Sequence, residues 1–368
     1  MENSQVIYRK YRPQKFSEVV GQEHVIKTLT SAISSGRVAH AYLFAGPRGT
    51  GKTTVARLLA KAVNCTDNSS YEPCNKCESC TEIMENRAMD LIEIDAASNR
   101  GIDEVRELRE RIRFAPTHSK YKVFVIDEAH QLTKEAFNAL LKTLEEPPAH
   151  AIFILATTEA HKMLPTILSR VQRFDFKKLS MPDVIKKLET VIKKEGFKIS
   201  EKALRIIALN SEGFMRDAES MLGQVIAFSG DKEITVEDIE NILGIVDINL
   251  AIKFIDLLVK KNSKEALAFI DKFVNQGYDL VQFLQSLINY SRKLMLLRVD
   301  KDLSKLIKEE LSAEQLNTAS KQAEEFTLVE LSKMIEILLD TLYQMKRSSF
   351  PQINVELATV EICGRKIN

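Results

Sequence analysis

Residues 41–63 read AYLFAGPRGTGKTTVARLLAKAV, and the architecture of the chain can be worked out from them in both directions. A short apolar run leads into a glycine-rich turn, and apolar residues then recur at helical spacing, which predicts a strand, a loop and a helix. Residues 46–53 match the pattern G-x-x-x-x-G-K-[ST], in which backbone N–H groups surround phosphate oxygens at the start of a helix. The stretch therefore predicts a phosphate-binding loop.

The residue types in this loop suit a nucleotide. Lys52 can reach the β- and γ-phosphates, and Thr53 can place its hydroxyl on Mg²⁺. Gly49 and Gly51 supply turn conformations that a side chain would obstruct. The alternative is a glycine-rich turn without a ligand, and the flanking strand and helix argue against it. The residues expected to contact the nucleotide are Gly46, Pro47, Arg48, Gly49, Thr50, Gly51, Lys52, Thr53 and Thr54.

Two further apolar runs end in polar residues that would complete a hydrolytic site. The strand in KVFVIDEAH (122–130) ends in Asp127 and Glu128, and the strand in AIFILATTE (151–159) ends in Thr157 and Thr158, both of which carry a hydroxyl. Asp127 can hold Mg²⁺, and Glu128 can orient and polarise the water that attacks the γ-phosphate. Thr158 is the hydroxyl that we favour for sensing the γ-phosphate or holding that water. The alternative for the two carboxylates is an exposed acidic turn.

The letters DEAH at 127–130 also label a family of helicases. That hypothesis requires a Ser-Ala-Thr stretch and an arginine-rich C-terminal motif, and the sequence contains neither. Because only the phosphate-site motifs are shared, the sequence disfavours a helicase.

Four of the five cysteines lie within residues 65–80, at the spacing C-x8-C-x2-C-x2-C. Thiols separated by two residues can converge on one tetrahedral zinc ion, and four thiolates leave no open position for a substrate. The spacing therefore predicts a structural zinc site, with plain reduced cysteines as the alternative; a disulfide framework would need an oxidising compartment. The expected ligands are Cys65, Cys74, Cys77 and Cys80.

The length and charge of the chain limit how many domains it can form and how it can contact nucleic acid. A chain of 368 residues is longer than a single core usually grows, so two or three domains are expected. The net charge is only +1, with 52 basic and 51 acidic residues, so any nucleic-acid contact has to come from a local basic surface. The N-terminus lacks an apolar signal region, and no apolar run approaches the roughly 20 residues that a membrane helix needs. We expect a cytoplasmic protein without membrane contact.

Hydrophobic periodicity divides the chain into three parts. Residues 1–178 alternate short apolar strands with amphipathic helices, the pattern of an α/β domain with a mostly parallel sheet and helices on both faces. Residues 179–243 form a small helical lid, and residues 244–368 form an all-helical block. Such a block is most simply a helical bundle, and on the pattern alone it could be monomeric, with no role in assembly.

These motifs occur in an order that resembles the AAA+ ATPases. More narrowly, YRKYRPQKFSEVVGQEHV (8–25), HAYLFAGPRGTGKTT (40–54), the cysteine cluster, FNALLKTLEEPP (137–148) and PTILSR (165–170) resemble the gamma/tau subunits of bacterial DNA polymerase III, which are clamp-loader ATPases. The motif-rich part of the resemblance covers about residues 8–230. It implies an AAA+ domain with a zinc insertion, a lid and a helical oligomerisation collar.

The resemblance also assigns residues outside the loop and the strand ends. The adenine-side wall of the pocket is implied at Tyr11, Arg12, Pro13, Val19 and Val20.

Two arginines receive roles from the same resemblance. Arg170 matches an arginine finger that acts in the neighbouring subunit's site, although Val171 replaces the usual cysteine after it. Arg216 matches a second sensor that contacts phosphate from the lid, while Phe214 and Gly223 depart from the family pattern around it. Either arginine could alternatively be a solvated helix residue or part of a structural ion pair.

The activity implied is ATP hydrolysis, with Mg²⁺ as cofactor and Zn²⁺ as a structural ion, that drives the opening and loading of a sliding clamp onto primed DNA. The chain would have no polymerase chemistry of its own. The implied partners are clamp-loader subunits of the delta and delta-prime types, the clamp, primer-template DNA, further copies of this chain and, if a longer chain exists, the replicative polymerase and helicase. The alternatives are another AAA+ DNA remodeller, such as a helicase loader or recombination motor, and a nucleotide-binding scaffold without turnover.

A helix rich in arginine is the main candidate for DNA contact. SNRGIDEVRELRERIRFAP (98–116) interleaves arginines with glutamates, so a solvated helix that neutralises itself through i,i+4 pairs such as Glu107 with Arg111 is the alternative. The family places helices here against duplex phosphates. The residues chosen for phosphate contact are Arg100, Arg106 and Lys142.

Overall fold

The computed structural model describes residues 6–67, 69–99, 101–229, 233–243, 248–300, 303, 307 and 311–364, without the side chains of residues 102–104, 106, 109, 240 and 241. The chain forms two compact units, Met1–Glu233 and Ile234–Asn368, and each is described by itself.

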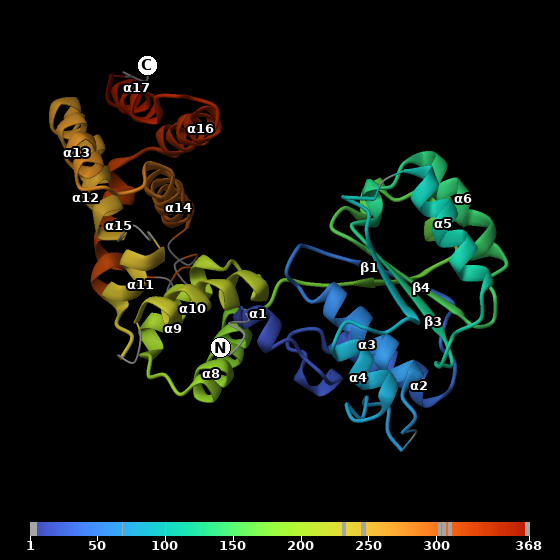
Figure 1. Cartoon of the computed structure of the whole chain (residues 1–368). Helices are drawn as coiled ribbons and strands as arrows, with labels where there is room; N and C mark the ends of the chain where they lie inside the picture. Colours follow the sequence, from blue (N-terminus) through green and yellow to red (C-terminus); the bar gives the residue numbers. More distant parts are fainter. Residues whose placement is uncertain are drawn as a thin grey trace. The chain divides into compact units, whose positions relative to one another are not determined.

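A five-stranded parallel sheet forms the centre of the first unit (Figure 1). Its strands are β1 (Ala41–Ala45), β2 (Leu91–Asp95), β3 (Lys122–Asp127), β4 (Ala151–Thr157) and β5 (Gln172–Asp175), in the spatial order β2-β3-β4-β1-β5. All four strand pairs are parallel. The central strands are apolar along their whole length because helices cover both faces of the sheet. The predicted α/β fold class is confirmed.

Alternate side chains of each central strand enter two different cores. Tyr42 and Phe44 of β1 pack with α2 (Glu23–Ser34), α3 (Lys52–Asn64) and α4 (Glu78–Met84) on one face. Leu43, one residue apart, packs on the other face with the helices there, α5 (Ile102–Arg113), α6 (Lys134–Glu145) and α7 (Pro165–Leu168). This alternation follows from the two-residue repeat of a strand, whereas the parallel direction of the strands brings their carboxyl ends to one edge of the sheet.

The first unit also contains the lid helices α8 (Met181–Glu195), α9 (Glu201–Asn210) and α10 (Met215–Ser229). Ser180 and Ser200 cap the first two by accepting hydrogen bonds from Asp183 N and Ala203 N, and Gly196 ends α8 in a left-handed conformation. The short helix α1 (Ile7–Lys10) packs on α10. Four shorter elements complete the described part of the unit: α7 and the 3₁₀ turns η1 (Phe16–Glu18), η2 (Ala129–Gln131) and η3 (Ala160–Lys162).

The second unit is helical throughout its described residues. Its helices are α11 (Val236–Leu243), α12 (Ile248–Val259), α13 (Ser263–Asn275), α14 (Leu280–Val299), α15 (Ala313–Glu325), α16 (Leu328–Met345) and α17 (Pro351–Gly364). Phe254, Phe273 and Phe283 meet in its core, and the buried Tyr290 hydroxyl donates to Gln322 Oε1 at 2.6 Å. Because α11 belongs to this unit, the unit begins earlier in the chain than the sequence-based boundary at residue 244, and the division into three domains stays a prediction.

Across the part of the chain that the structure describes, none of the helices combines the length and the apolar character that crossing a membrane requires.

Candidate nucleotide and zinc sites

A cavity of about 510 Å³ lies in the first unit where the ends of β2 and β3, the loop after β1, the N-terminal segment and the lid come together. This is the edge at which parallel strands present their carboxyl ends, the usual place for a ligand in an open α/β sheet. The predicted residues that line it are Arg12, Pro13, Val19, Val20, Arg48, Gly49, Thr50, Gly51, Lys52, Thr53, Thr54, Asp127, Glu128 and Arg216.

Two glycines allow the loop to take its shape. Gly51 has a φ of 98°, a left-handed conformation, at the N-cap of α3. At Gly46 the backbone runs so close to the residue after β5 that a Cβ atom would lie 2.4 Å from the carbonyl oxygen of Phe176. The loop is therefore held between the start of α3 and the exit of β5.

Lys52 contacts the loop itself. Its ammonium donates to the carbonyl oxygens of Gly46 at 2.7 Å and Pro47 at 2.8 Å, and only 6% of the residue is exposed. Burial lowers the pKa of Lys52, while the negative charges of Glu128 and Asp127 act in the opposite direction. Gly46 and Pro47, which the sequence predicts to contact the nucleotide, thus contact Lys52 through their carbonyl groups.

The oxygen donors expected for Mg²⁺ lie together. The Thr53 hydroxyl donates to Asp127 Oδ2 at 2.8 Å. Asp95 ends β2 directly beside Asp127 in the parallel register, and it also lines the cavity. Hydroxyl and carboxylate oxygens are the ligands that Mg²⁺ prefers, so this donor set fits the ion. The rule that parallel strands end at one edge would have found Asp95 from the sequence.

Glu128 is held by Thr158, which directly follows the neighbouring strand β4. Its backbone is left-handed, with φ of 48°, and Asp127 Oδ1 accepts from its N–H at 3.0 Å. Glu128 Oε2 accepts from the Thr158 hydroxyl at 2.8 Å and from the Thr158 N–H at 3.3 Å. The structure therefore joins Thr158 to the predicted general base by hydrogen bonds. The role of Thr158 toward the γ-phosphate stays a prediction.

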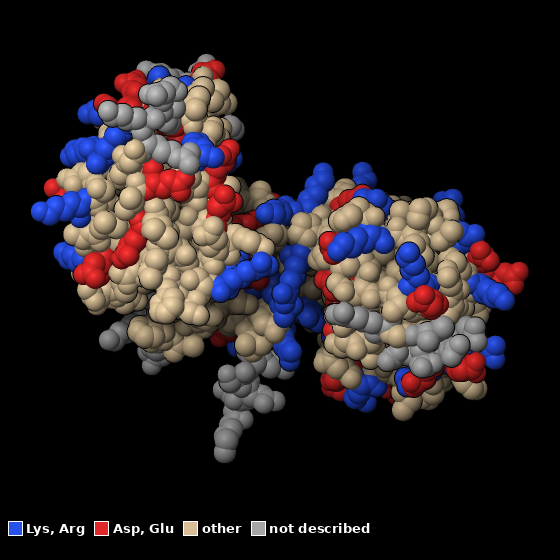
Figure 2. All heavy atoms as spheres, turned by 90° about the horizontal axis from the view of Figure 1, so that it is seen from above, with Lys and Arg blue, Asp and Glu red and all other residues tan. Residues whose placement is uncertain are grey.

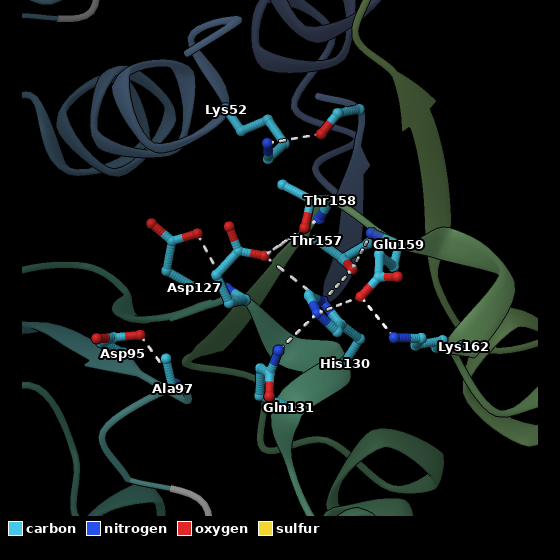
Figure 3. Close-up of polar contacts among 12 residues, drawn as sticks. Lys52, Asp95, Ala97, Asp127, His130, Gln131, Thr157, Thr158, Glu159 and Lys162 are labelled. Atoms are coloured by element: carbon cyan, nitrogen blue, oxygen red, sulfur yellow. Dashed lines mark hydrogen bonds and ion pairs between the residues drawn. The ribbon is translucent and has the colours of Figure 1, made fainter. Parts of the chain in front are cut away.

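Behind Glu128 lies a polar network centred on His130, which the sequence reasoning did not select (Figure 3). The imidazole has 4% side-chain exposure; its Nδ1 lies 2.9 Å from Thr157 Oγ1, and its Nε2 lies 3.0 Å from Glu159 Oε2. Lys162 donates to the same Glu159 oxygen at 2.8 Å. His130 Nδ1 also lies 3.5 Å from Glu128 Oε2, so the network connects the predicted general base with the end of β4.

The aromatic residue of the N-terminal segment at the cavity is Tyr8 rather than the predicted Tyr11. The Tyr8 ring lies under the guanidinium of Arg216, 4.7 Å from ring centroid to Cζ, and the hydrogen bond with Arg216 lowers the Tyr8 pKa. Tyr11 ends α1, and its ring instead meets Lys10 and Lys194 at 5.5 and 5.8 Å. The motif located the segment correctly, but helix α1 determines which ring faces the cavity.

A buried carboxyl of the lid is a second cavity residue that the sequence reasoning missed. Glu219 lies one turn after Arg216 on α10 and is 6% exposed. Burial raises its pKa to about 7, against the opposing charges of Lys187 and Arg12, which line the same cavity. Burial also disfavours the charged form of Lys187, because it lowers the pKa of this ammonium group. Glu219, Lys187 and Arg12 thus bring one acidic and two basic groups together in the lining of the cavity.

Arg170 lies outside the set of residues that line this cavity. Between α7 and β5, its guanidinium donates to Glu145 Oε1 at 2.8 Å and to the Thr166 carbonyl at 2.6 Å. The side chain is 33% exposed. An ion pair at this exposure contributes little free energy, so Arg170 can exchange Glu145 for another anion at small cost.

The four clustered cysteines come together as the spacing predicts. The sulfurs of Cys65, Cys74, Cys77 and Cys80 all lie within 4.8 Å of one another. Four sulfurs at about 2.3 Å from a zinc ion would be about 3.8 Å apart, so the cluster fits a tetrahedral Zn²⁺ site. Backbone N–H groups already point at the sulfurs, with Cys77 N 3.3 Å from Cys74 Sγ, as is common where thiolates bind metal.

The DNA-contact predictions can be examined only in part. Arg100 and the side chain of Arg106 lie outside the described residues, and Lys142 is exposed on α6. On α5, the expected pair forms, with Arg111 donating to Glu107 at 2.7 Å. The face seen in Figure 2 carries acidic and basic side chains intermixed, with uncharged areas between them. The charge of Arg111 is therefore neutralised within the arginine-rich helix itself.

Comparison with known families gives three consecutive matches. The family described as "DNA polymerase III, delta subunit" matches residues 21–180. "DNA polymerase III clamp loader subunit, ATPase lid domain" matches residues 183–231, and "DNA polymerase III subunits gamma and tau domain III" matches residues 234–366. The three matches follow the sheet domain, the lid helices and the second unit.

Individual relatives match over nearly the whole chain. The DNA polymerase III subunit tau of Bacillus subtilis is 45% identical over 359 residues, which cover 98% of this chain and 63% of that protein. The DNA polymerase III subunit gamma of Buchnera aphidicola is 34% identical over 360 residues, which cover 98% of this chain and 99% of that protein. Among solved structures, the RuvB Holliday junction branch migration motor of Thermotoga maritima has a TM-score of 0.48 and 19% identity, covering 68% of this chain and 79% of its own. The chain spans about 63% of the length of the Bacillus relative.

Proposed function

We propose, since the chain belongs to the family of DNA polymerase III gamma and tau subunits, that it is an ATP-hydrolysing clamp-loader subunit. ATP binding and hydrolysis would drive the opening of a sliding clamp and its loading onto primed DNA in the bacterial cytoplasm, at the replisome. One observation supports this most strongly: the P-loop lysine, the Thr53–Asp127 pair and Glu128, which accepts a hydrogen bond from Thr158, converge on a single cavity.

The proposed reaction assigns one step to each group. Lys52 would exchange its carbonyl partners for phosphate oxygens and hold the β- and γ-phosphates. Thr53 and Asp127 would hold Mg²⁺, which neutralises charge on the phosphate oxygens when bound. Glu128 would accept the proton of the attacking water as the water oxygen bonds to the γ-phosphorus, and the bond to the leaving ADP oxygen breaks. Thr158 keeps Glu128 directed toward the cavity.

Arg170 and Arg216 are proposed to supply positive charge from two directions. Arg216 already lines the cavity from the lid. Arg170 would leave Glu145 and act in the site of a neighbouring subunit. Mixing Lys52→Ala chains with Arg170→Ala chains tests this: each assembly alone should be inactive, and mixed assemblies should recover part of the turnover. Without recovery, Arg170 does not act across an interface.

Assembly is proposed to use an exposed apolar surface of the second unit. Leu339 and Tyr343 on α16 are 49% and 59% exposed, and Leu357 on α17 is 63% exposed. Positions 353, 357 and 360 recur at helical spacing, which places them on one face of α17, and Phe350 directly precedes that helix. Apolar side chains gathered in this way mark interaction surfaces. We call this set the α16–α17 face; its residues are Leu339, Tyr343, Phe350, Ile353, Leu357 and Val360.

The experiment that tests the function is ATP turnover by the purified chain with partner clamp-loader subunits and a sliding clamp. Primed single-stranded DNA is compared with blunt duplex at fixed salt, since contacts to phosphates are salt-dependent. Stimulation that requires both the primed junction and the clamp supports clamp loading. Equal rates on every DNA would indicate another AAA+ remodeller, and no turnover would indicate a scaffold.

A further inference from the structure

The base-side wall of the nucleotide cavity has little secondary structure of its own. It is formed by residues 12–20, which we call the wall segment and which contain only the turn η1. Arg12, Pro13, Glu18, Val19 and Val20 from this segment line the cavity. A segment without a helix or strand ladder keeps its shape through hydrogen bonds to the rest of the fold, so the contacts that hold it set the shape of the cavity.

The four-cysteine module supplies a central contact of this kind. Glu72 lies between Cys65 and Cys74, and its carboxylate accepts from two consecutive backbone N–H groups, those of Phe16 at 2.7 Å and Ser17 at 2.8 Å. Each carboxylate oxygen takes one donor, so the contact is bidentate and charge-assisted. The side chain of Phe16 is fully buried beneath it. The contact joins parts of the chain that are 55 and 56 residues apart.

The wall segment is also attached on either side of Glu72. Lys61, in the last turn of α3, donates to Gln14 Oε1 at 2.8 Å, and the Gln14 N–H donates to Glu18 Oε2 at 2.7 Å. Beyond the segment, Gln22 donates to the carbonyl oxygen of Lys177 at 2.7 Å. Lys61 and Gln22 both belong to elements that exist without the cysteine module. Glu72 is the contact by which that module reaches the cavity wall.

From this geometry we infer that the four-cysteine module is a positioning element for nucleotide binding: metal bound by its thiolates fixes the loop that carries Glu72, and Glu72 fixes the wall segment. Closing the eight-residue loop between Cys65 and Cys74 removes conformational freedom from the residues that hold Glu72 in place. The inference rests on the proposed nucleotide site. Glu72 itself contacts neither the P-loop nor the predicted Mg²⁺ ligands, and it acts through the backbone of the wall.

Coupling of this kind works in both directions. If the metal-bound module favours the wall conformation that binds ATP, then bound ATP must favour the metal-bound module by the same factor. The Kd for zinc, measured by competition with a chelator, is therefore expected to be lower in the presence of ATP by the same factor. This readout needs no hydrolysis and no partner subunits.

The test uses the full chain and the variant Glu72→Gln, with Glu78→Gln as the matched control. Glu78 is an exposed carboxylate of the same module, on α4. ATP affinity is measured by calorimetry with and without zinc, and hydrogen exchange is followed in a peptide covering residues 14–20. Glu72→Gln places an amide N–H₂ against one of the two backbone donors. We expect it to raise the Kd for ATP roughly tenfold, because the binding-competent wall is less populated, and to increase exchange at residues 16 and 17.

The same effects are expected for zinc-depleted wild-type chain, while Glu78→Gln should change neither quantity. The inference is overturned if Glu72→Gln binds ATP as wild type does, or if its wall segment exchanges faster with no change in ATP affinity. It is equally overturned if ATP leaves the Kd for zinc unchanged. If wild-type chain binds no ATP, the proposed function fails, and the exchange measurement still decides whether Glu72 and zinc hold the wall.

Discussion

Among single residues, Glu219 has the most unusual environment in the nucleotide cavity. Its carboxyl is buried on α10, and its pKa of about 7 lies well above the ordinary value of 4.5. Between these two pH values the folded chain binds a proton that the unfolded chain has lost, so the free energy of unfolding falls as pH rises through this window. Above pH 7 the cost levels off at about 3 kcal/mol.

Replacing Glu219 by Gln removes this titration. The free energy of unfolding of wild type falls between pH 6 and pH 8 because of Glu219, and that of Glu219→Gln does not. The difference between the two chains, in favour of the variant, is therefore expected to grow by about 1 kcal/mol over this range. Urea unfolding followed by circular dichroism at both pH values measures it. Asp217→Asn, an exposed carboxylate of the same helix, is the control and should show no such pH dependence. An advantage of equal size at both pH values would contradict the prediction.

His130 is expected to stabilise the end of β4 and to keep Glu128 in place. Truncation in His130→Ala leaves Thr157 Oγ1 without its imidazole partner in a buried position. The expected cost is about 1–3 kcal/mol in the opening free energy of β4 amides, measured by hydrogen exchange, together with a lower kcat for ATP. His130→Gln keeps one polar contact and should recover part of both. If the alanine variant exchanges like wild type, the network does not stabilise the strand.

The residues of the candidate site show which of its features can be predicted from the sequence alone. Lys52, Thr53, Asp127 and Glu128 were predicted because loop spacing and strand ends are local patterns. Tyr8 and Glu219 at the cavity, and His130 next to Glu128, were missed because their positions depend on how α1, α10 and η2 pack, and no spacing rule encodes that packing. The bidentate contact of Glu72 likewise spans more than fifty residues of sequence.

At the scale of elements, the strands and helices of the first unit follow closely from periodicity. The central strands are continuous apolar runs, and the helices carry one apolar stripe each, so the parallel sheet with two covered faces was predicted and is confirmed. The sequence gives no equally local signal for the packing of α11, which belongs to the second unit although the predicted boundary lies after it.

The junction between β1 and β5 is expected to be sensitive to one added methyl group. In Gly46→Ala the Cβ atom would meet the backbone oxygen of Phe176 at 2.4 Å, so the loop or the strand exit has to move. We expect a loss of about 1–3 kcal/mol in unfolding free energy and weaker ATP binding. Gly36→Ala is the control, because Gly36 has a φ of 68° but has open space around it. Equal losses in the two variants would show that backbone strain, not the close approach, is responsible.

At the scale of the whole molecule, the second unit combines a core that contains paired polar groups with an apolar outer surface. Gln322 accepts from the buried Tyr290 hydroxyl and donates to the Ile252 carbonyl at 3.0 Å, so the bundle interior leaves these polar groups paired. The α16–α17 face, in contrast, exposes large apolar side chains to solvent in the single chain. This contrast is expected where a stable bundle also associates with other subunits.

Self-association through that face is tested by Leu357→Glu. A glutamate at the centre of an apolar interface would bury an unpaired charge, so assemblies present at about 10 µM are expected to dissociate into monomers in sedimentation velocity. Met89→Glu, which changes an exposed apolar residue of the first unit, should leave the sedimentation coefficient unchanged. A wild-type chain that is monomeric by itself would contradict homo-oligomerisation through this surface.

The two carbonyl contacts of Lys52 have a consequence for ligand choice. Since the ammonium already donates to Gly46 and Pro47, recognition at this loop is a substitution reaction in which an internal oxygen leaves as an external one arrives. Only an oxygen with more negative charge than a peptide carbonyl gains from the substitution. Sugars, hydroxyls and a nucleoside without phosphates gain nothing from Lys52. The loop therefore discriminates by charge before the shape of the base contributes.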